Sequence, residues 1–167
     1  VKNLAAWLRA AAQLQQRMPD ACFVLCGGAG EELDPEASAA LHAMPRPGQV
    51  RLIPFRDDPQ RLYPAFSIFS MSSLSEALPM VLLEAMACGV PCVASDVGDC
   101  AEVIGDTGRI VPPNNPGALS AAWRQLLSLP AGERHLLGGR ARDRIVNRFS
   151  LEVVARTYES AYDSLVE

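Results

Sequence analysis

Short apolar runs alternate with helical patterns along most of the chain. The runs predict strands over residues 21–26, 50–54, 66–71, 91–95 and 109–111. The first run, ACFVLC, is continuous rather than alternating, which is typical of a strand buried on both faces of a parallel sheet. Because strands that alternate with helices favour parallel connections, the pattern predicts an α/β fold with a mostly parallel sheet.

Helical periodicity fills the segments between the strands and the C-terminal part of the chain. The predicted helices cover residues 1–18, 31–43, 59–63, 79–88, 100–104, 116–129, 131–147 and 150–167. Asp57 and Asp58 are predicted to cap the N-terminus of the short helix at residues 59–63. Ser150 is a suitable N-cap for the last helix. The apolar face of the last helix comprises Val154, Tyr158, Ala161 and Leu165.

The stretch from Met71 to Asp99 predicts a strand end, a polar loop, a helix, a tight turn and a buried strand in close succession. Pro79 suits the first helical position, because proline lacks an N–H and disfavours helical geometry in the preceding residue. Gly89 suits the left-handed backbone that often ends a helix. We therefore expect this helix to run from about Pro79 to Cys88.

Two carboxylates belong to this stretch. Glu76 lies on the loop, and Glu84 lies inside a helix that is apolar nearly all round. On local pattern alone, Glu84 has an internal partner or caps a loop, and Glu76 is an ordinary surface residue. The alternative is that both face a ligand rich in hydroxyls, since carboxylates accept paired hydrogen bonds from vicinal diols. The start of the helix also favours phosphate, so that diol and phosphate together indicate a nucleotide or a nucleotide sugar.

The composition is that of one ordinary globular domain. The 167 residues are 49% hydrophobic and 20% charged, which is enough to form a buried core. The net charge of −4 argues against a nucleic-acid partner and gives no support for attachment to anionic lipid. The sequence contains neither a signal-peptide pattern nor an apolar run of membrane-spanning length.

Cysteine and histidine positions indicate neither a metal site nor nucleophilic catalysis. The five cysteines are Cys22, Cys26, Cys88, Cys92 and Cys100. They lack the C-x2-C spacing of a zinc site, and most lie in apolar runs, so we expect reduced thiols that act as small core residues in a cytosolic protein. His42 and His135 lie far from the Met71–Asp99 stretch, and we expect both on helices or at the surface.

From Glu76 onward, the sequence E-A-L-P-M-V-L-L-E-A-M-A-C-G-V-P-C-V-A-S-D-V-G resembles the E-x7-E region of retaining GT-B glycosyltransferases of family 4. The bare spacing of the two glutamates is common, but the following E-A-M-A-C-G-V-P makes the combined pattern specific. The resemblance implies that residues 1–167 form the C-terminal, donor-binding half of a GT-B fold, a Rossmann-like three-layer α/β/α domain. The strand that opens this half in the family is not in the sequence. Because that strand is central in a doubly wound sheet, we expect a gap in the sheet.

The resemblance also implies roles on the donor side. Glu84 would hold the ribose hydroxyls, and Glu76 would contact the donor sugar. The backbone that receives the diphosphate comprises Leu78, Pro79, Met80 and Val81. Lys2 matches the lysine that ends the family's R-x4-K element and neutralises the leaving diphosphate, although by itself it would be a solvated residue.

Two loops at predicted strand ends complete the expected donor site. The main chain around Phe55 and Arg56 would border the base. The glycine loop whose backbone approaches the donor nucleotide comprises Gly27, Gly28 and Gly30. Taken alone, this loop is a strand-to-helix turn, because it matches neither the P-loop nor the dinucleotide-binding pattern.

Three features depart from the family pattern. The arginine of R-x4-K lies outside the sequence. Leu78-Pro79 replaces the Phe-Gly of many members. Gly98-Asp99 replaces the usual glycine pair, which predicts a different geometry for that donor loop.

The reaction implied is transfer of a sugar, with UDP as the expected carrier, to the hydroxyl of a glycan or lipid-linked acceptor with retention of configuration. No D-x-D motif is present, so no metal or other cofactor is expected. The acceptor half would be an N-terminal domain of the same protein, towards which residues 150–167 would pack, leaving Val154, Tyr158 and Leu165 partly exposed. We expect a cytoplasmic location, with any contact to the inner membrane face made through that domain. The alternatives are a sugar-nucleotide 2-epimerase and a non-catalytic nucleotide-sugar-binding remnant.

Overall fold

The computed structural model describes residues 2–27 and 33–166, the last of them by its backbone alone. Its strands are β1 (Phe23–Cys26), β2 (Val50–Ile53), β3 (Phe69–Met71), β4 (Cys92–Ser95) and β5 (Arg109–Val111). Its α-helices are α1 (Leu4–Gln15), α2 (Pro35–His42), α3 (Met80–Ala87), α4 (Cys100–Ile104), α5 (Pro116–Leu127), α6 (Ala131–Phe149) and α7 (Leu151–Val166). Three 3-10 turns are η1 (Pro47–Gln49), η2 (Pro59–Arg61) and η3 (Tyr63–Ala65).

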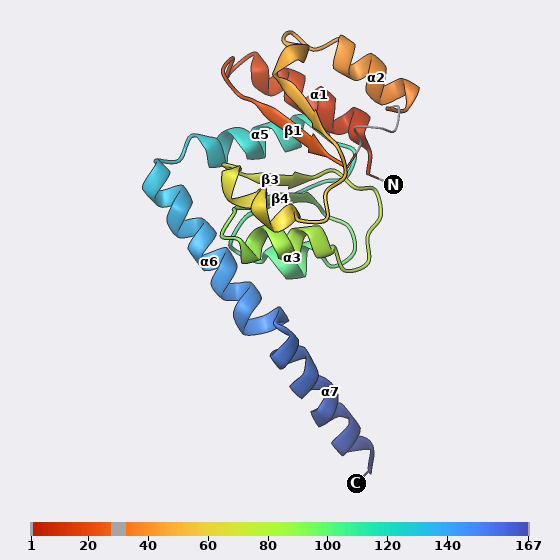
Figure 1. Cartoon of the computed structure of the whole chain (residues 1–167), viewed down its shortest axis with the longest axis vertical. Coiled ribbons are helices and arrows are strands. Elements are labelled where there is room, and N and C mark those ends of the chain that lie inside the picture. Colours follow the sequence, from red (N-terminus) through yellow and green to blue (C-terminus); the bar gives the residue numbers. More distant parts are fainter. Residues whose placement is uncertain (1, 28–32, 167) are drawn as a thin grey trace.

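The strands form two parallel sheets, β1–β2 and β3–β4–β5. Over the described residues, no ladder joins one sheet to the other, so the sheet is interrupted as predicted (Figure 1). In the larger sheet β4 is central: Val93 pairs with Ser70 on one side and with Arg109 on the other. The α/β fold with parallel sheets is therefore confirmed.

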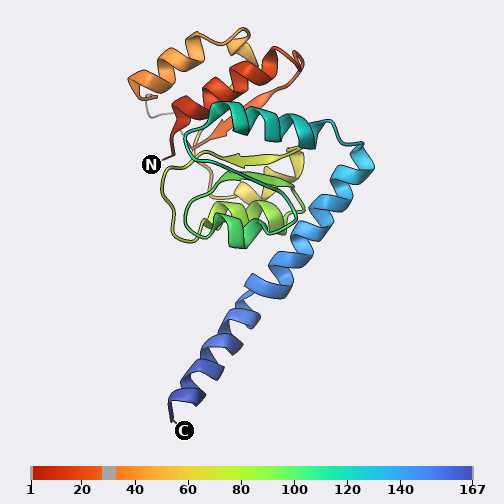
Figure 2. The same cartoon turned by 180° about the vertical axis from the view of Figure 1, so that it is seen from behind.

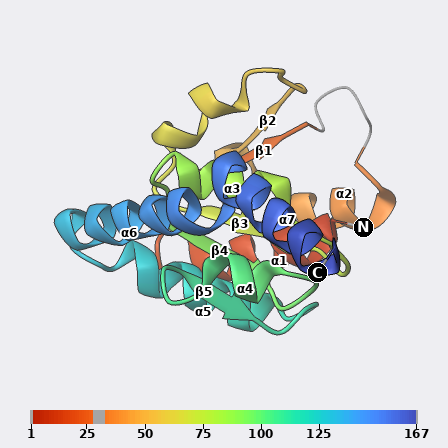
Figure 3. The same ribbon diagram turned by 90° about the horizontal axis from the view of Figure 1, so that it is seen from below.

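Helices cover both faces of the β3–β4–β5 sheet. Seen from behind, α5 lies between α1 and this sheet (Figure 2). On the opposite face α3 packs against α6, which crosses that side of the molecule (Figure 3). Strand β4 contributes to both cores: Val93 packs with α1 and α5, whereas Cys92 and Ala94 pack with α3 and α4. This alternation gives the three-layer arrangement that the resemblance implied.

The β1 strand is less enclosed than its apolar run predicted. Phe23 is buried against Trp7 and Trp123 in an aromatic cluster, but Cys26 is exposed and Leu52 on the neighbouring β2 is 42% exposed. The expectation of burial on both faces is therefore wrong for this strand. Phe23, Leu25 and Val50 pack in the core with α1 and α2, and over the described residues neither strand contributes to the second core.

The short helix predicted at 59–63 is instead the pair of 3-10 turns η2 and η3. Pro64 explains this, because a proline disfavours α-helical geometry at the residue before it, Tyr63. Asp58 stands at the N-cap of η2 but makes no capping hydrogen bond, since its carboxylate pairs with Arg56 instead. The predicted capping role of Asp58 is thus wrong.

The helix α7 projects away from the body beyond α6 (Figure 1). Val154, Tyr158 and Leu165 are 37%, 62% and 81% exposed, as the sequence predicted. The predicted N-cap is also present, since the backbone N–H of Val153 donates to Ser150 Oγ at 3.4 Å. Among the helices described, none has the length and apolar character of a membrane span.

Candidate functional site

The structure brings together the two residues that the sequence singled out for catalysis. The ammonium group of Lys2 lies 2.8 Å from Glu76 Oε1, although 74 positions separate them in the chain. The Glu76 side chain is only 15% exposed, whereas that of Lys2 is 61% exposed. Lys2 is therefore solvated, as the plainer interpretation required, but it also pairs with Glu76.

Two serines at the carboxyl end of β3 hold this pair in place. Ser72 Oγ lies 2.8 Å from the carbonyl oxygen of Lys2 and 3.1 Å from that of Asn3. Ser73 Oγ, which is fully buried, donates to Glu76 Oε1 at 2.6 Å. One serine thus fixes the backbone of Lys2 and the other fixes the carboxylate that Lys2 meets. Sequence reasoning missed both, although adjacent hydroxyls at the end of a strand face the edge where ligands bind.

Asn3 connects the Lys2 backbone to helix α1. Its backbone is left-handed, with φ of 49°, and its side-chain oxygen accepts from the N–H of Ala6 at 3.4 Å. Its amide nitrogen also donates to Asn114 at 3.1 Å. These contacts explain why the helix begins at Leu4 rather than at Val1 as predicted, and why Lys2 leaves the helix axis to reach Glu76.

The surroundings of Glu76 favour its charged form. Burial raises the pKa of this carboxyl, but the hydrogen bonds from Lys2 and Ser73 outweigh burial and hold the pKa below its ordinary value. Glu76 is therefore a carboxylate at neutral pH. Its Oε1 is occupied by two donors, while Oε2 accepts no hydrogen bond from the described residues.

The start of α3 presents unpaired backbone donors beside apolar side chains. Pro79 is the N-cap rather than the first helical residue as predicted, and none of the described side chains caps the helix. Because proline has no N–H, the predicted diphosphate contact at Pro79 is wrong, and Leu78, Met80 and Val81 remain as the possible donors. Their side chains are 44%, 58% and 37% exposed, so this helix start is open to an anion.

The loop after β4 packs directly on the backbone around Glu76. Gly98 has φ of +51°, and a Cβ there would lie 2.2 Å from the carbonyl oxygen of Glu76. The next residue, Asp99, has φ of −87° and donates its N–H to Ala77 at 3.0 Å. The backbone therefore requires glycine only at Gly98, and the replacement of the second glycine by Asp99 strains nothing.

Glu84 has an internal partner, as the plainer interpretation required. The hydroxyl of Tyr63 donates to Glu84 Oε2 at 2.9 Å. Glu84 itself is half-buried, on the second turn of α3. Its Oε1 accepts no hydrogen bond from the part of the chain that the structure describes, so one carboxylate oxygen remains available to a ligand.

The predicted base-binding loop lies open. Phe55 is 81% exposed, and Arg56 makes a two-pronged contact with Asp58 at 2.7 and 2.8 Å. The hydrogen bonds that Arg56 donates to Asp58 raise the pKa of Arg56 and lower the pKa of Asp58. Of the glycine loop, Gly27 has φ of 101° and bonds to Ile53 at 3.0 Å, while Gly28 and Gly30 lie outside the described residues.

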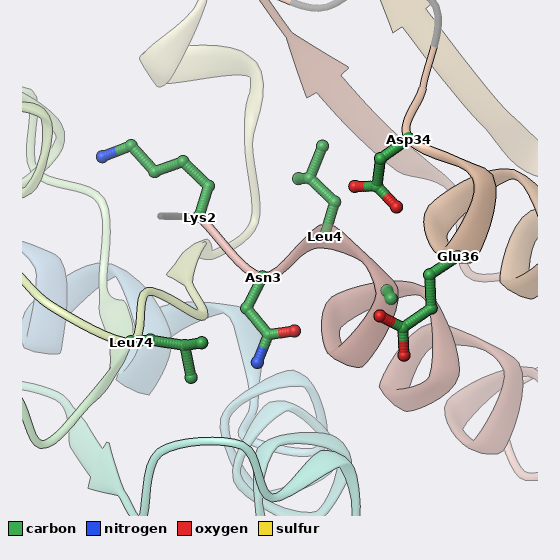
Figure 4. A pocket seen from close by; sticks show the side chains of 7 residues that line it. Lys2, Asn3, Leu4, Asp34, Glu36 and Leu74 are labelled. Atoms are coloured by element: carbon green, nitrogen blue, oxygen red, sulfur yellow. The ribbon is translucent and has the colours of Figure 1, made fainter.

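A cavity of about 290 Å³ opens beside Lys2 (Figure 4). It is lined by Lys2, Asn3, Leu4, Ala5, Asp34, Glu36 and Leu74. In Figure 4 the Lys2 ammonium points away from Asp34 and Glu36, in keeping with its pairing to Glu76. The cavity adjoins the Lys2–Glu76 pair, but neither Glu84 nor the start of α3 lines it.

Cysteines and histidines stay apart from these contacts. Cys92 and Cys100 are buried, as predicted, but Cys22 and Cys26 are exposed, so the expectation of core thiols holds only in part. His42 and His135 are exposed on α2 and α6, as predicted. Over residues 2–27 and 33–166, His, Cys, Asp and Glu side chains form no group of three or more suited to a metal.

The fold and the arrangement of the site define the class of protein. Anabaena Alr3699/HepE, solved in complex with UDP, is similar with a TM-score of 0.85 at 21% identity, covering 98% of this chain and 45% of that one. Sucrose-phosphate synthase from Thermosynechococcus elongatus gives a TM-score of 0.80 at 26% identity, covering 99% of this chain and 42% of that one. The chain thus has the Rossmann-like architecture of one half of a GT-B glycosyltransferase.

Sequence comparison then gives the family. The family described as Glycosyl transferases group 1 matches residues 1–129. The D-inositol 3-phosphate glycosyltransferase of Salinispora tropica is 34% identical over 95% of this chain and 35% of its own length. The N-acetyl-alpha-D-glucosaminyl L-malate synthase of Bacillus anthracis is 35% identical over 64% of this chain and 28% of its own length. The chain belongs to the glycosyl transferases group 1 family, and it spans about a third of the length of these curated relatives.

Proposed function

We propose that this chain is the donor-binding part of a retaining glycosyltransferase of family 4, which transfers a sugar from a nucleoside diphosphate to an acceptor hydroxyl. The observation that carries the proposal is the contact of Lys2 with Glu76 beside the uncapped start of α3. In this chain of the group 1 family, Lys2 supplies a cation, Glu76 supplies a carboxylate and the start of α3 supplies free N–H groups. Lys2 is distant in the sequence from the other two. UDP is the proposed nucleotide, supported by the complexes of Alr3699/HepE with UDP and with UDP-glucose.

Each group has a role that suits its chemistry. The exposed ammonium of Lys2 and the N–H groups of Leu78, Met80 and Val81 receive the diphosphate. Glu76, charged and nearly buried, accepts hydrogen bonds from hydroxyls of the donor sugar through its free oxygen, Oε2. Glu84 likewise accepts hydrogen bonds from the ribose hydroxyls through its free oxygen, Oε1.

The proposed mechanism stabilises the leaving group. When the bond between the sugar and the diphosphate breaks, negative charge grows on the diphosphate and positive charge on the sugar ring. Lys2 and the helix start face the first charge, and the Glu76 carboxylate faces the second. We propose that Lys2 and the helix start supply the positive potential that the diphosphate needs, so that no metal or other cofactor takes part.

The remaining features follow from the same proposal. Gly27 approaches the nucleotide, and Phe55 and Arg56 border the base. Gly28 and Gly30, outside the described residues, keep the role that the sequence predicts. An N-terminal domain of the same protein binds the acceptor, a glycan or lipid-linked hydroxyl. The exposed face of α7 packs towards that domain. We propose a cytoplasmic location, with contact to the inner membrane face made through that domain.

The test is thermal unfolding of the chain with and without UDP or GDP, in the wild type and in Glu84→Ala. A nucleotide at 100 times its dissociation constant adds about 2.7 kcal/mol to the stability of the wild type. We expect one nucleotide to raise the midpoint of the wild type and to leave that of Glu84→Ala nearly unchanged. Glu133→Ala, at an exposed position on α6, is the control and should respond like the wild type. No shift with either nucleotide, or equal shifts in wild type and Glu84→Ala, contradicts the proposal.

A further inference from the structure

The Glu84 carboxylate is held from outside its own helix. Its partner, Tyr63, belongs to η3 and is separated from it by 21 positions in the chain. Tyr63 is only 5% exposed, and its hydroxyl is the one polar atom of the side chain. This hydroxyl donates a hydrogen bond to Glu84 Oε2 at 2.9 Å.

The tyrosine ring itself is fixed by packing. It lies edge-on to Phe66, with ring centres 6.4 Å apart, and edge-on to Phe69 at 5.5 Å. It belongs to the same buried cluster as Leu82 and Met86 of α3. A ring enclosed in this way has little rotamer freedom, so its hydroxyl is a stationary donor.

The hydroxyl also keeps its proton under ordinary conditions. Burial, followed by the hydrogen bond to Glu84 and the charge of that carboxylate, raises the pKa of Tyr63 well above its usual value. The Tyr63 hydroxyl therefore stays protonated and remains the donor of its hydrogen bond to Glu84. The Tyr63 hydroxyl fixes Oε2 of Glu84. Oε1 of Glu84 accepts no hydrogen bond from any described residue.

We propose that Tyr63 is a positioning residue for donor binding: its hydroxyl fixes one oxygen of Glu84, so that the other is aimed at a vicinal diol of the ligand. This inference rests on the proposed function, because it gives Glu84 the ribose hydroxyls as its ligand. It assigns to Tyr63 a part in ligand affinity that burial and ring packing alone do not require. Without the hydroxyl, the Glu84 side chain samples further rotamers, and binding must then restrict it.

The test measures binding of UDP and of 2′,3′-dideoxy-UDP to the full chain by titration calorimetry; if GDP alone stabilises the wild type, the guanine pair is used. Tyr63→Phe keeps the buried ring and removes only the hydroxyl. We expect it to weaken UDP about tenfold, equal to about 1.4 kcal/mol, and to leave the dideoxy nucleotide unchanged. Tyr158→Phe, at an exposed position on α7, is the matched control and should bind both nucleotides like the wild type.

A second measurement uses the double variant Tyr63→Phe/Glu84→Gln. If Tyr63 acts through Glu84, the double variant binds UDP no more weakly than Glu84→Gln alone. Equal weakening of both nucleotides in Tyr63→Phe, or additive losses in the double variant, would give Tyr63 a structural role only and overturn the inference. Unchanged UDP binding in Tyr63→Phe overturns it as well. If the wild type binds neither UDP nor GDP, the proposed function fails first, and this inference fails with it.

Discussion

The β1–β2 and β3–β4–β5 sheets belong to one parallel fold, yet they are enclosed to different degrees. Every residue of β4 is buried, between β3 and β5 and between two hydrophobic clusters. The β2 strand has no fully buried residue, and its Leu52 is 42% exposed. A strand of a parallel sheet is enclosed only when it has neighbouring strands at both edges and helices on both faces. Of the two strands compared, β4 meets these conditions and β2 does not.

The difference matters for the site. Glu76 and Glu84 belong to the enclosed region, where buried hydroxyls hold both carboxylates, although the residues at the start of α3 are themselves partly exposed. Phe55 and Arg56 extend from the end of β2 and are exposed, with a single surface carboxylate as the partner of Arg56. Under the proposed function, the region that receives the sugar and diphosphate is thus preorganised, whereas the loop proposed for the base is one that a ligand must order.

The largest effect should come from truncating the enclosed core. Leu82, on α3, is 0% exposed, so Leu82→Ala is expected to lower the free energy of unfolding by about 2–5 kcal/mol through lost burial and a cavity. Leu52→Ala removes a half-exposed side chain of the same size and should cost less than about 1 kcal/mol. Urea unfolding of both variants measures the difference. Equal losses would mean that the two regions are packed alike and would remove the basis of the comparison.

A backbone change should have a smaller but clear effect. In Gly98→Ala the new Cβ lies 2.2 Å from the carbonyl oxygen of Glu76 and 2.6 Å from that of Ala77, so the loop after β4 must move. We expect a loss of roughly 2–3 kcal/mol in the free energy of unfolding, because φ there is also left-handed. The control is Gly48→Ala, where nothing lies within 4 Å and the change should be under about 1 kcal/mol. If Gly98→Ala were as stable as Gly48→Ala, this loop would not be tightly packed on the Glu76 backbone.

Local sequence pattern predicted the enclosed region better than the open one. Strand and helix positions from Met71 to Asp99 follow from proline, glycine and apolar spacing, which are properties of neighbouring residues. The same reasoning wrongly predicted that the strand ACFVLC is buried on both of its faces. The burial of a strand depends on helices that pack against it from other parts of the chain, which local pattern does not show. Asp58 was misassigned as a cap for a different reason: its carboxylate pairs with Arg56, two positions away, instead of with the backbone.

The sequence motif singled out two carboxylates and a lysine, whose role in a site stays a prediction, but it did not indicate the groups that hold them in place. Lys2, Glu76 and Glu84 were found through a motif. Ser72, Ser73 and Tyr63 carry no distinctive spacing, and their roles exist only once the chain has folded. A hydroxyl that bonds to a carbonyl 70 positions away is a product of tertiary packing, which periodicity does not encode.

The smallest effect expected is a pH dependence that distinguishes the two ion pairs. Because the pKa of Glu76 is lowered on folding, its contribution to stability is present above the unfolded value of 4.5 and is lost as the pH falls through the lower folded value. Glu76→Gln should therefore be about 1 kcal/mol less stable than the wild type at pH 7, a modest figure because Lys2 is largely exposed. At a pH below the folded value the difference should vanish, and urea unfolding at both pH values measures it. Asp58→Asn removes the carboxylate of the open region, whose pKa is also lowered, but solvent screens that pair, so its pH-dependent difference from the wild type should be smaller and should disappear in high salt. A Glu76→Gln difference that stays the same at low pH would show that the carboxylate charge does not stabilise the folded chain, and that Ser73 and Lys2 hold Glu76 by shape alone.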